Sequence, residues 1–193
     1  MCRAPSAPEN EMRRSNASRS SVPPVFAAID FETADYGRDS ACAVAVVRVE
    51  RTEIVDRVRY LIRPPRRHFV FSYLHGITWD DVVDAPTFGQ LWPSLCRVLE
   101  GVEFLAAHNA SFDQSVLNAC CEQAGVLAPG HSFCCTMRIA RSTWELYPTT
   151  LPDVCNRLQI TLQHHDPLSD AEACAKIVIA AINAGWNPSD ISR

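Results

Sequence analysis

The sequence predicts one α/β domain in which helices pack on the faces of a mixed β-sheet. Three strand-like segments come first, and strands then alternate with helices, an order that is typical of layered α/β domains. The chain has 193 residues, of which 47% are hydrophobic and 21% are charged. This length supports one ordinary hydrophobic core and hardly two, so we expect a single folded domain.

Three strands are expected at the start of the folded part. Residues 25–29 are a short apolar run, and residues 41–49 alternate small and β-branched side chains. Residues 53–62 continue with a strand-like composition. Short runs of this kind favour strands, and three in succession suggest a meander.

Helices and strands then alternate along the second half of the chain. Two segments match the capping box that opens many helices, Thr78-x-x-Asp81 and Thr87-x-x-Gln90. The second should open a helix that ends near residue 100. The remaining elements are expected to be a strand at 104–107, a helix from Ser111 that stops at Gly125, a strand near Phe133, helices from Thr136 and Thr150, and a last helix at about 169–184.

The composition divides the chain into a folded part and two tails. Residues 1–24 are rich in Ser, Pro and Arg and are predicted to be a disordered tail. Residues 25–185 should form the domain, and residues 186–193 a short C-terminal tail. Because no apolar run is long enough for a membrane span or a signal peptide, a soluble cytoplasmic protein is expected.

The cysteines do not suggest a disulfide framework. There are nine of them, an odd number, and two pairs are adjacent, Cys120-Cys121 and Cys134-Cys135. Neighbouring cysteines rarely bridge each other, and no C-x-x-C spacing indicates a zinc site. We therefore expect reduced cysteines that act as small buried hydrophobic residues.

The charge balance limits the ways in which the protein could bind nucleic acid. Lys plus Arg (18) against Asp plus Glu (22) gives a net charge of −4. This excludes the strongly basic profile of a protein that coats nucleic acid through phosphate contacts. An enzyme that grips only a strand end remains compatible with the charge.

Four acidic residues are placed where the pattern expects core side chains. Asp30 follows an apolar strand and Glu32 comes two residues later, so both carboxylates should point to the same face of the strand. Asp113 lies on the apolar stripe of its predicted helix, and Asp170 repeats this in the last helix. Taken singly, the helical acids could be explained by the helix dipole and the other two as solvated strand-end residues.

Taken together, the four carboxylates predict a site for divalent metal ions. Buried carboxylates must be paired or must coordinate a metal, and no Lys or Arg occupies a matching position. Carboxylate oxygen is the ligand that Mg²⁺ and Mn²⁺ prefer. Two such ions, about 3.5 to 4 Å apart, would form a clamp for in-line displacement at a phosphoryl group.

A general base for such a reaction is expected close to the last helix. His165 lies five residues before Asp170, and a histidine pKa of about 6.5 suits proton abstraction from water at neutral pH. His164 is adjacent and has the same chemistry. Spacing to Asp170 alone leaves the choice between the two histidines open, but the loop should aim only one of two consecutive side chains at the metal site.

Four sequence blocks resemble a known family. They are Asp30-Phe31-Glu32-Thr33, His75-Gly76-Ile77-Thr78, the run His108-Asn109-Ala110-Ser111-Phe112-Asp113, and His165-x-x-x-x-Asp170. In this order and at these separations they resemble the DnaQ-like 3′-5′ exonucleases of the DEDDh type. That superfamily includes the epsilon-type proofreading subunit of bacterial DNA polymerase III and ribonuclease T. The resemblance runs from about residue 25 to residue 182.

The resemblance implies a fold and a role for each matching residue. The fold would be ribonuclease H-like, with a mixed five-stranded sheet and helices on both faces. Two Mg²⁺ or Mn²⁺ ions would be held with Asp30 as the bridge, Glu32 and Asp170 at the first ion and Asp113 at the second. His165 would be the general base, in preference to His164. Contacts to the terminal nucleotides would come from the remaining motif residues, which are Phe31, Thr33, Leu74, His75 and Phe112.

The function expected from the resemblance is removal of 5′-mononucleotides from the 3′ end of single-stranded or frayed nucleic acid. Single-stranded DNA is the favoured partner and RNA is an alternative. No polymerase-binding tail is apparent after the last helix, which favours a free-standing nuclease. Two other hypotheses stay open: a catalytically silent module that binds strand ends or a protein, and a hydrolase of very short oligonucleotides.

Overall fold

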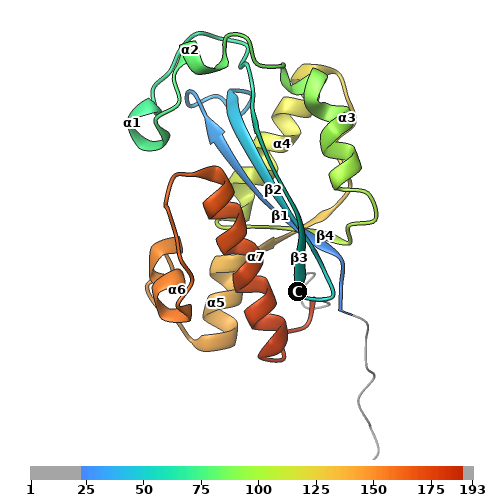
Figure 1. Ribbon diagram of the computed structural model, residues 1–193, viewed down its shortest axis with the longest axis vertical. Coiled ribbons are helices and arrows are strands. Elements are labelled where there is room, and N and C mark those ends of the chain that lie inside the picture. Colours follow the sequence, from blue (N-terminus) through green and yellow to red (C-terminus); the bar gives the residue numbers. More distant parts are fainter. Residues whose placement is uncertain (1–22, 189–193) are drawn as a thin grey trace, which may run out of the picture.

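The computed structural model describes residues 23–188, which form a five-stranded sheet and seven helices (Figure 1). The strands are β1 (Phe26–Thr33), β2 (Ala41–Glu50), β3 (Glu53–Leu61), β4 (Phe104–Ala107) and β5 (Ser132–Cys135). The helices are α1 (Ser72–His75), α2 (Trp79–Val82), α3 (Phe88–Val98), α4 (Ala110–Ala124), α5 (Thr136–Trp144), α6 (Leu151–Leu158) and α7 (Pro167–Asn183).

The sheet is mixed, as the order of elements predicted. Its strand order is β3-β2-β1-β4-β5. The first three strands form an antiparallel meander, because short turns connect them. β4 runs parallel to β1, and β5 runs parallel to β4, since helices connect these strands. The ribonuclease H-like α/β fold expected from the sequence is confirmed.

The helices cover both faces of the sheet. Helices α5, α6 and α7 pack on one face, where the core includes Phe26 and Ala28 of β1. Helices α3 and α4 pack on the other face, against Ala27 and Ile29. Figure 1 shows α7 crossing the first face, with α1 and α2 near the end of β1. The alternation of side chains along β1 therefore separates two hydrophobic cores.

The first strand is longer than expected and contains the acidic pair. The apolar run predicted a strand at residues 25–29, but β1 continues to Thr33. Its pairing with β2 also continues, with Asp30 opposite Ala45 and Glu32 opposite Ala43. The short alanine side chains on the neighbouring strand leave room beside the two carboxylates.

Two short helices, α1 and α2, were not among the expected elements. Helix α1 is a single turn without a side-chain cap, and it ends at Gly76 in the left-handed conformation. A turn of this length has too few residues to show helical periodicity. Helix α2, by contrast, begins after the predicted capping box of Thr78 and Asp81. The two turns place the His75-Gly76-Ile77-Thr78 block above the end of β1.

The cysteine prediction holds in part. The eight cysteines in the described part of the chain are all free. Six of them are buried, as expected, but Cys96 of α3 is exposed and Cys135 is half-buried. Cys96 lies on the outer side of its helix, where an apolar residue has no core to reach.

The predicted tails lie largely outside the described residues. Only residues 23–24 of the N-terminal tail and 186–188 of the C-terminal tail are described. Within the range 23–188, no helix is long and apolar enough to cross a membrane.

Candidate active site

The four predicted carboxylates meet at the carboxyl end of β1. Asp30 and Glu32 lie in β1 on the face that α7 covers, Asp113 lies in the first turn of α4, and Asp170 lies in the first turn of α7. The charges of Asp113, Asp170 and Glu32 raise the pKa of Asp30, and the charge of Asp170 raises the pKa of Glu32, as expected for neighbouring carboxylates. Three elements distant in sequence thus contribute one acidic cluster.

Asp113 is fixed by the backbone of β1. Its side chain is 2% exposed, and its Oδ1 accepts a hydrogen bond of 3.1 Å from the backbone N–H of Phe31. The pairing of β1 with β4 reaches only from Phe26 to Ala28, so the later part of β1 is free of β4. At Phe31, the Asp113 carboxylate accepts the backbone hydrogen bond that a neighbouring strand would otherwise accept. This bond holds the carboxylate beside Asp30.

Asp170 is fixed through only one of its two oxygens. It is 4% exposed, and its Oδ2 accepts hydrogen bonds from His164 Nδ1, at 2.9 Å, and from the backbone N–H of His165, at 3.1 Å. Its Oδ1 is buried and has no hydrogen-bond partner. A buried acceptor without a partner is costly, so this oxygen fits a ligand position.

The electrostatics of the cluster favour a cation. Burial, followed by the charges of neighbouring carboxylates, raises the pKa of Glu32 to about 7 and that of Asp30 well above its ordinary value. Burial also raises the pKa of Asp113 to about 8, against two backbone hydrogen bonds that lower it. Ionised carboxylates at these positions repel one another unless a cation lies between them.

The donor set fits a hard divalent ion. Asp30, Glu32, Asp113 and Asp170 offer carboxylate oxygens, and the free Oδ1 of Asp170 is one of them. Mg²⁺ and Mn²⁺ prefer oxygen ligands of this type. The residues present therefore fit the metal ions that the sequence resemblance implies.

Both histidines lie beside Asp170, which corrects one expectation. Two consecutive side chains of an extended loop point to opposite sides, so only one was expected to reach the acidic cluster. His165 instead adopts the left-handed conformation, with φ of 68°. Its ring stacks on that of His164, with the centroids 3.9 Å apart. A ring nitrogen of each histidine and a carboxylate oxygen of Asp170 all lie within 4.8 Å of one another. The positive φ removes the alternation.

His165 keeps a neutral imidazole more readily than a free histidine. Partial burial lowers its pKa, the nearby His164 lowers it further, and Asp170 acts in the opposite direction. A neutral imidazole can accept a proton, which a general base requires.

His75 connects α1 to the acidic strand. Its Nδ1 accepts a hydrogen bond of 3.0 Å from the backbone N–H of Ile77, and its Nε2 donates to the carbonyl oxygen of Thr33 at 3.3 Å. Both ring nitrogens are thus engaged by backbone groups. Leu74, the neighbouring predicted contact, has 43% of its surface exposed.

The other predicted substrate contacts differ in exposure. The side chains of Phe31 and Thr33 are buried, so only their backbone atoms could meet a ligand. Phe112 is half-buried, and the guanidinium of Arg38 lies 4.4 Å from its ring centroid. One face of the Phe112 ring is therefore occupied by a cation.

The sequence reasoning missed Arg38 and the role of His108. Arg38 lies in the β1–β2 loop and is the cation whose charge lowers the pKa of Asp113 slightly. His108 joins three segments, because its Nδ1 contacts Thr136 Oγ1 at 2.8 Å and its Nε2 donates to the Thr149 carbonyl at 3.0 Å. Burial lowers its pKa to about 4. The position of His108 directly after the apolar strand at 104–107 is the sequence feature that could have suggested this bridging role.

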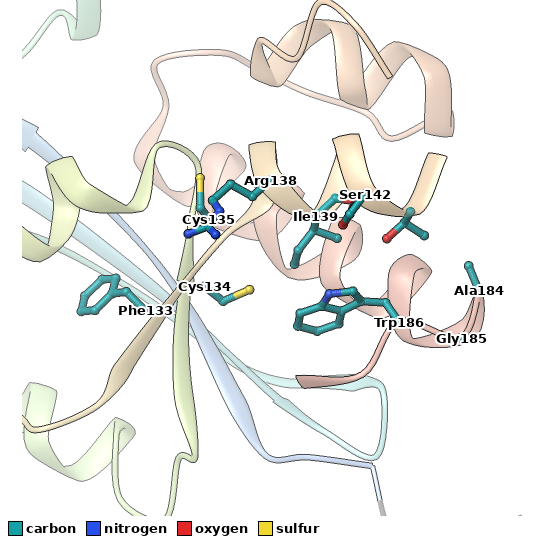
Figure 2. Close-up of a pocket in the computed structure, with 10 residues that line it drawn as sticks. Phe133, Cys134, Cys135, Arg138, Ile139, Ser142, Ala184, Gly185 and Trp186 are labelled. Carbon is teal, nitrogen blue, oxygen red and sulfur yellow. Dashed lines mark hydrogen bonds between the residues drawn. The ribbon is translucent and has the colours of Figure 1, made fainter. Parts of the chain in front are cut away.

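A well-formed pocket lies elsewhere on the molecule. It has a volume of about 560 Å³ and is lined by β5, α5 and the residues that follow α7. Figure 2 shows Trp186 pointing toward Ile139 and Cys134 in this pocket. None of the predicted site residues lines it, so the acidic cluster remains the candidate active site.

Known sequences show similarity along almost the whole folded part. A family model described as "Exonuclease" (RNase_T) matches residues 27–178. The PolC-type DNA polymerase III of Bacillus cereus is 30% identical over 160 residues, which are 80% of this chain but only 11% of that protein. Exodeoxyribonuclease 10 of Escherichia coli (strain K12) is 30% identical over 174 residues, 85% of this chain and 72% of that protein.

Solved structures show the same fold. A structure of exonuclease X in complex with 5′ overhanging duplex DNA has a TM-score of 0.71 and 27% identity, and the match covers 87% of this chain and 99% of that one. The nuclease domain of 3′hExo, a DEDDh family member bound to rAMP, has a TM-score of 0.72 and 21% identity, with 83% and 92% covered.

Proposed function

The chain belongs to the exonuclease family that contains the DnaQ-like DEDDh enzymes, and on this premise we propose that it is a metal-dependent 3′-5′ exonuclease. It would remove 5′-mononucleotides from the 3′ end of single-stranded or frayed nucleic acid. The observation that carries the proposal is that carboxylates from β1, α4 and α7 lie near one another, and that one buried oxygen of Asp170 among them has no hydrogen-bond partner. A purely structural acidic cluster would be paired with Arg or Lys.

The metal ions are proposed to bind at the acidic cluster. Asp30, Glu32 and Asp170 would hold one ion, and Asp30 and Asp113 the other. When bound, the pair supplies positive charge at the reacting phosphate and lowers the pKa of the attacking water. DEDDh exonucleases are typically dependent on divalent metals, and the donor set of this chain agrees with that.

His165 is proposed to take the proton from the attacking water. The water oxygen then forms a bond to phosphorus, the bond from phosphorus to the 3′ oxygen of the next nucleotide breaks, and that oxygen takes up a proton. The left-handed backbone at His165 and the stacked ring of His164 direct the imidazole to the same side as Asp170. General-base catalysis of this type contributes about 10²- to 10⁴-fold to a rate.

The terminal nucleotides are proposed to lie between β1, α1 and α4. The backbone of Phe31 and Thr33 would meet the last nucleotide, and Leu74, His75 and Phe112 would border the strand. Leu74 is exposed enough to touch a base, whereas Phe112 would act together with the Arg38 guanidinium that covers it. Such contacts are tolerant of sequence, as an exonuclease requires.

DNA is the favoured substrate. Support comes from exodeoxyribonuclease 10, which shares 30% identity, and from exonuclease X, whose structure contains duplex DNA. Since the chain matches only about a tenth of the PolC-type polymerases, nothing in that similarity extends to a polymerase activity.

A direct assay tests the proposed function. DNA and RNA oligomers labelled at the 5′ end are incubated with Mg²⁺, with Mn²⁺ or with excess EDTA, beside the Asp30→Ala variant. We expect a ladder that shortens from the 3′ end with either metal, and full-length oligomer in EDTA or with the variant. Equal degradation by wild type and variant would contradict the assignment of the site.

The same assay separates the alternatives. A catalytically silent strand-end module would retain oligomers without shortening them. A hydrolase of very short oligonucleotides would cleave a dinucleotide much faster than a 20-mer. Comparable rates per terminal bond on both lengths would support the exonuclease proposal.

A further inference from the structure

The two oxygens of Asp170 have different surroundings, and His164 is responsible for much of the difference. Oδ2 accepts two hydrogen bonds, one of them from His164 Nδ1 at 2.9 Å, whereas Oδ1 accepts none. With Oδ2 held on the side of the histidine loop, Oδ1 is the oxygen left for a cation. The orientation of this carboxylate therefore depends on a ring donor that the proposed reaction does not use.

The same imidazole also restricts His165. The two rings are 21° from parallel with centroids 3.9 Å apart, so rotation of the His165 ring about its side-chain bonds would collide with His164. His165 has a strained positive φ of 68°, and the stack opposes relaxation of that conformation. One side chain thus contacts both a proposed metal ligand and the proposed base.

We propose that His164 is a positioning residue of the active site: its Nδ1–H holds the Asp170 carboxylate and its ring holds the imidazole of His165. The part that concerns His165 rests on the proposed function. His164 is not proposed as a metal ligand, because its Nδ1 lies 2.9 Å from Asp170 Oδ2 and is assigned the proton of that hydrogen bond, since an ionised carboxylate can only accept. Hydrogen bonds to ligating groups typically change metal affinity or activity by about 10- to 100-fold.

Three substitutions separate the two roles of His164. His164→Asn retains a side-chain N–H donor but has no ring to stack. His164→Phe retains a ring but has no donor, and His164→Ala has neither. His68→Ala is the matched control, since His68 is an exposed histidine outside the site.

The first measurement is Mn²⁺ binding by titration calorimetry, which needs no catalysis. We expect His164→Ala and His164→Phe to bind Mn²⁺ about tenfold or more weakly than wild type, and His164→Asn to recover most of the affinity. His68→Ala should bind as wild type does. Wild-type affinity in His164→Phe, or equal losses in the Asn and Phe variants, would overturn the role toward Asp170.

The second measurement is the rate at saturating Mn²⁺ with a single-stranded oligomer. We expect kcat to fall about tenfold or more in His164→Ala and His164→Asn and to fall less in His164→Phe, which keeps a ring to stack, with KM within about twofold of wild type in all three. A rise in KM at unchanged kcat would overturn the role toward His165. If His164→Ala does not fold, as judged by circular dichroism, the Asn and Phe variants alone decide both questions.

The two proposals can fail separately. A wild-type protein without exonuclease activity, but with the expected order of Mn²⁺ affinities, would reject the proposed function and retain His164 as the residue that orients Asp170. Full activity together with Mn²⁺ affinities that do not depend on residue 164 would do the reverse.

Discussion

Asp30 is the carboxylate whose pKa the three other members of the acidic cluster all raise. Burial is the largest cause that raises the pKa of Asp30, and the charges of Asp113, Asp170 and Glu32 raise it further. Asp30→Asn removes one charge while keeping the shape of the side chain. In EDTA at pH 8 we expect the variant to be more stable by about 1 kcal/mol, which corresponds to a rise in Tm of roughly 2–4 °C. Activity should fall by about 10³-fold or more, because several kcal/mol of metal-dependent stabilisation is lost.

The measurement pairs thermal unfolding in EDTA with release of a 3′-terminal label in Mn²⁺. Both results are needed, since a general loss of structure would also abolish activity. A variant that is inactive and less stable than wild type would contradict the electrostatic explanation.

Arg38 is expected to contact a phosphate of the bound strand. Its guanidinium lies over Phe112 in a loop next to the carboxylates, and the overall charge of the chain is negative. Arg38→Ala should raise KM about tenfold, the effect of a lost charge-assisted hydrogen bond of ~1.5 kcal/mol. It should leave kcat nearly unchanged. The slope of log binding constant against log salt concentration should become less steep by about 0.7, the value for one phosphate contact on a single strand.

Arg97→Ala is the control for this change. Arg97 is also exposed, but it lies in α3, and its guanidinium donates to Ser94 of the same helix. KM and salt dependence should stay at wild-type values in this variant. Equal effects of the two substitutions would show that Arg38 acts only through the general charge of the protein.

At the scale of elements, the start of α7 is the segment that positions the most site residues. Asp166 is its N-cap, and its Oδ1 accepts hydrogen bonds of 3.0 Å from the backbone N–H groups of Leu168 and Ser169. Pro167 follows at the first helical position, where its missing N–H costs nothing. The helix therefore begins two residues before the predicted residue 169, and Asp170 falls in its first turn.

Asp166→Ala should destabilise the protein by about 1 kcal/mol, because two backbone donors lose their acceptor. Asp166→Asn can still cap the helix and should retain most of the stability. Urea unfolding at pH 7 in the presence of Mn²⁺ compares the two variants with wild type. If the Asn variant is as unstable as the Ala variant, the loss of stability would be due to the missing charge of Asp166 and not to the missing helix cap.

Elements with a local cause were predictable, and those with a tertiary cause were not. The capping boxes at Thr78 and Thr87 marked helix starts because both partners of the box lie within three residues of each other. Helix α1 is joined to the end of β1 by the hydrogen bond of His75 to the Thr33 carbonyl, across 42 positions of sequence. The same holds for the extension of β1 beyond residue 29, which is due to its pairing with β2.

At the scale of the whole molecule, the mixed sheet with its opening meander and the inward orientation of the four acids followed from the sequence. Period-2 and period-3.6 patterns indicate which way a side chain faces, and so they placed Asp30, Glu32, Asp113 and Asp170 inward. The contacts of Arg38 with Phe112 and of His164 with His165 depend on loop conformations. These are set by a positive φ and by packing, which leave no periodic signal in the sequence.

The metal-free protein should become less stable as the pH rises from 7 to 8. Glu32 and Asp113 have folded-state pKa values raised to about 7 and about 8, far above those of the unfolded chain. The folded state therefore binds more protons, and the stabilisation from these two groups, complete below about pH 4, disappears as the pH passes through 7 and 8. At roughly 1.4 kcal/mol per pKa unit, the loss over this interval is on the order of 1 kcal/mol, or about 2–4 °C in Tm.

The effect of Mn²⁺ and of the Glu32→Gln variant, and not the pH interval alone, separates the carboxylates from the other titrating groups. His108, with a pKa lowered to about 4, is neutral in the folded state throughout, and unfolded histidines are nearly so. Buried thiols such as Cys120 and Cys134 have pKa values raised to about 12, whereas unfolded cysteines begin to ionise below pH 8, so the thiols add a decline that is the same in wild type and in Glu32→Gln. Saturating Mn²⁺ should reverse the sign, because ion binding requires ionised carboxylates and so strengthens with pH. Thermal unfolding in EDTA and in Mn²⁺, with Glu32→Gln as the variant that lacks one titrating group, measures both slopes. A decline of equal size with and without the ion would show that the cluster does not bind it.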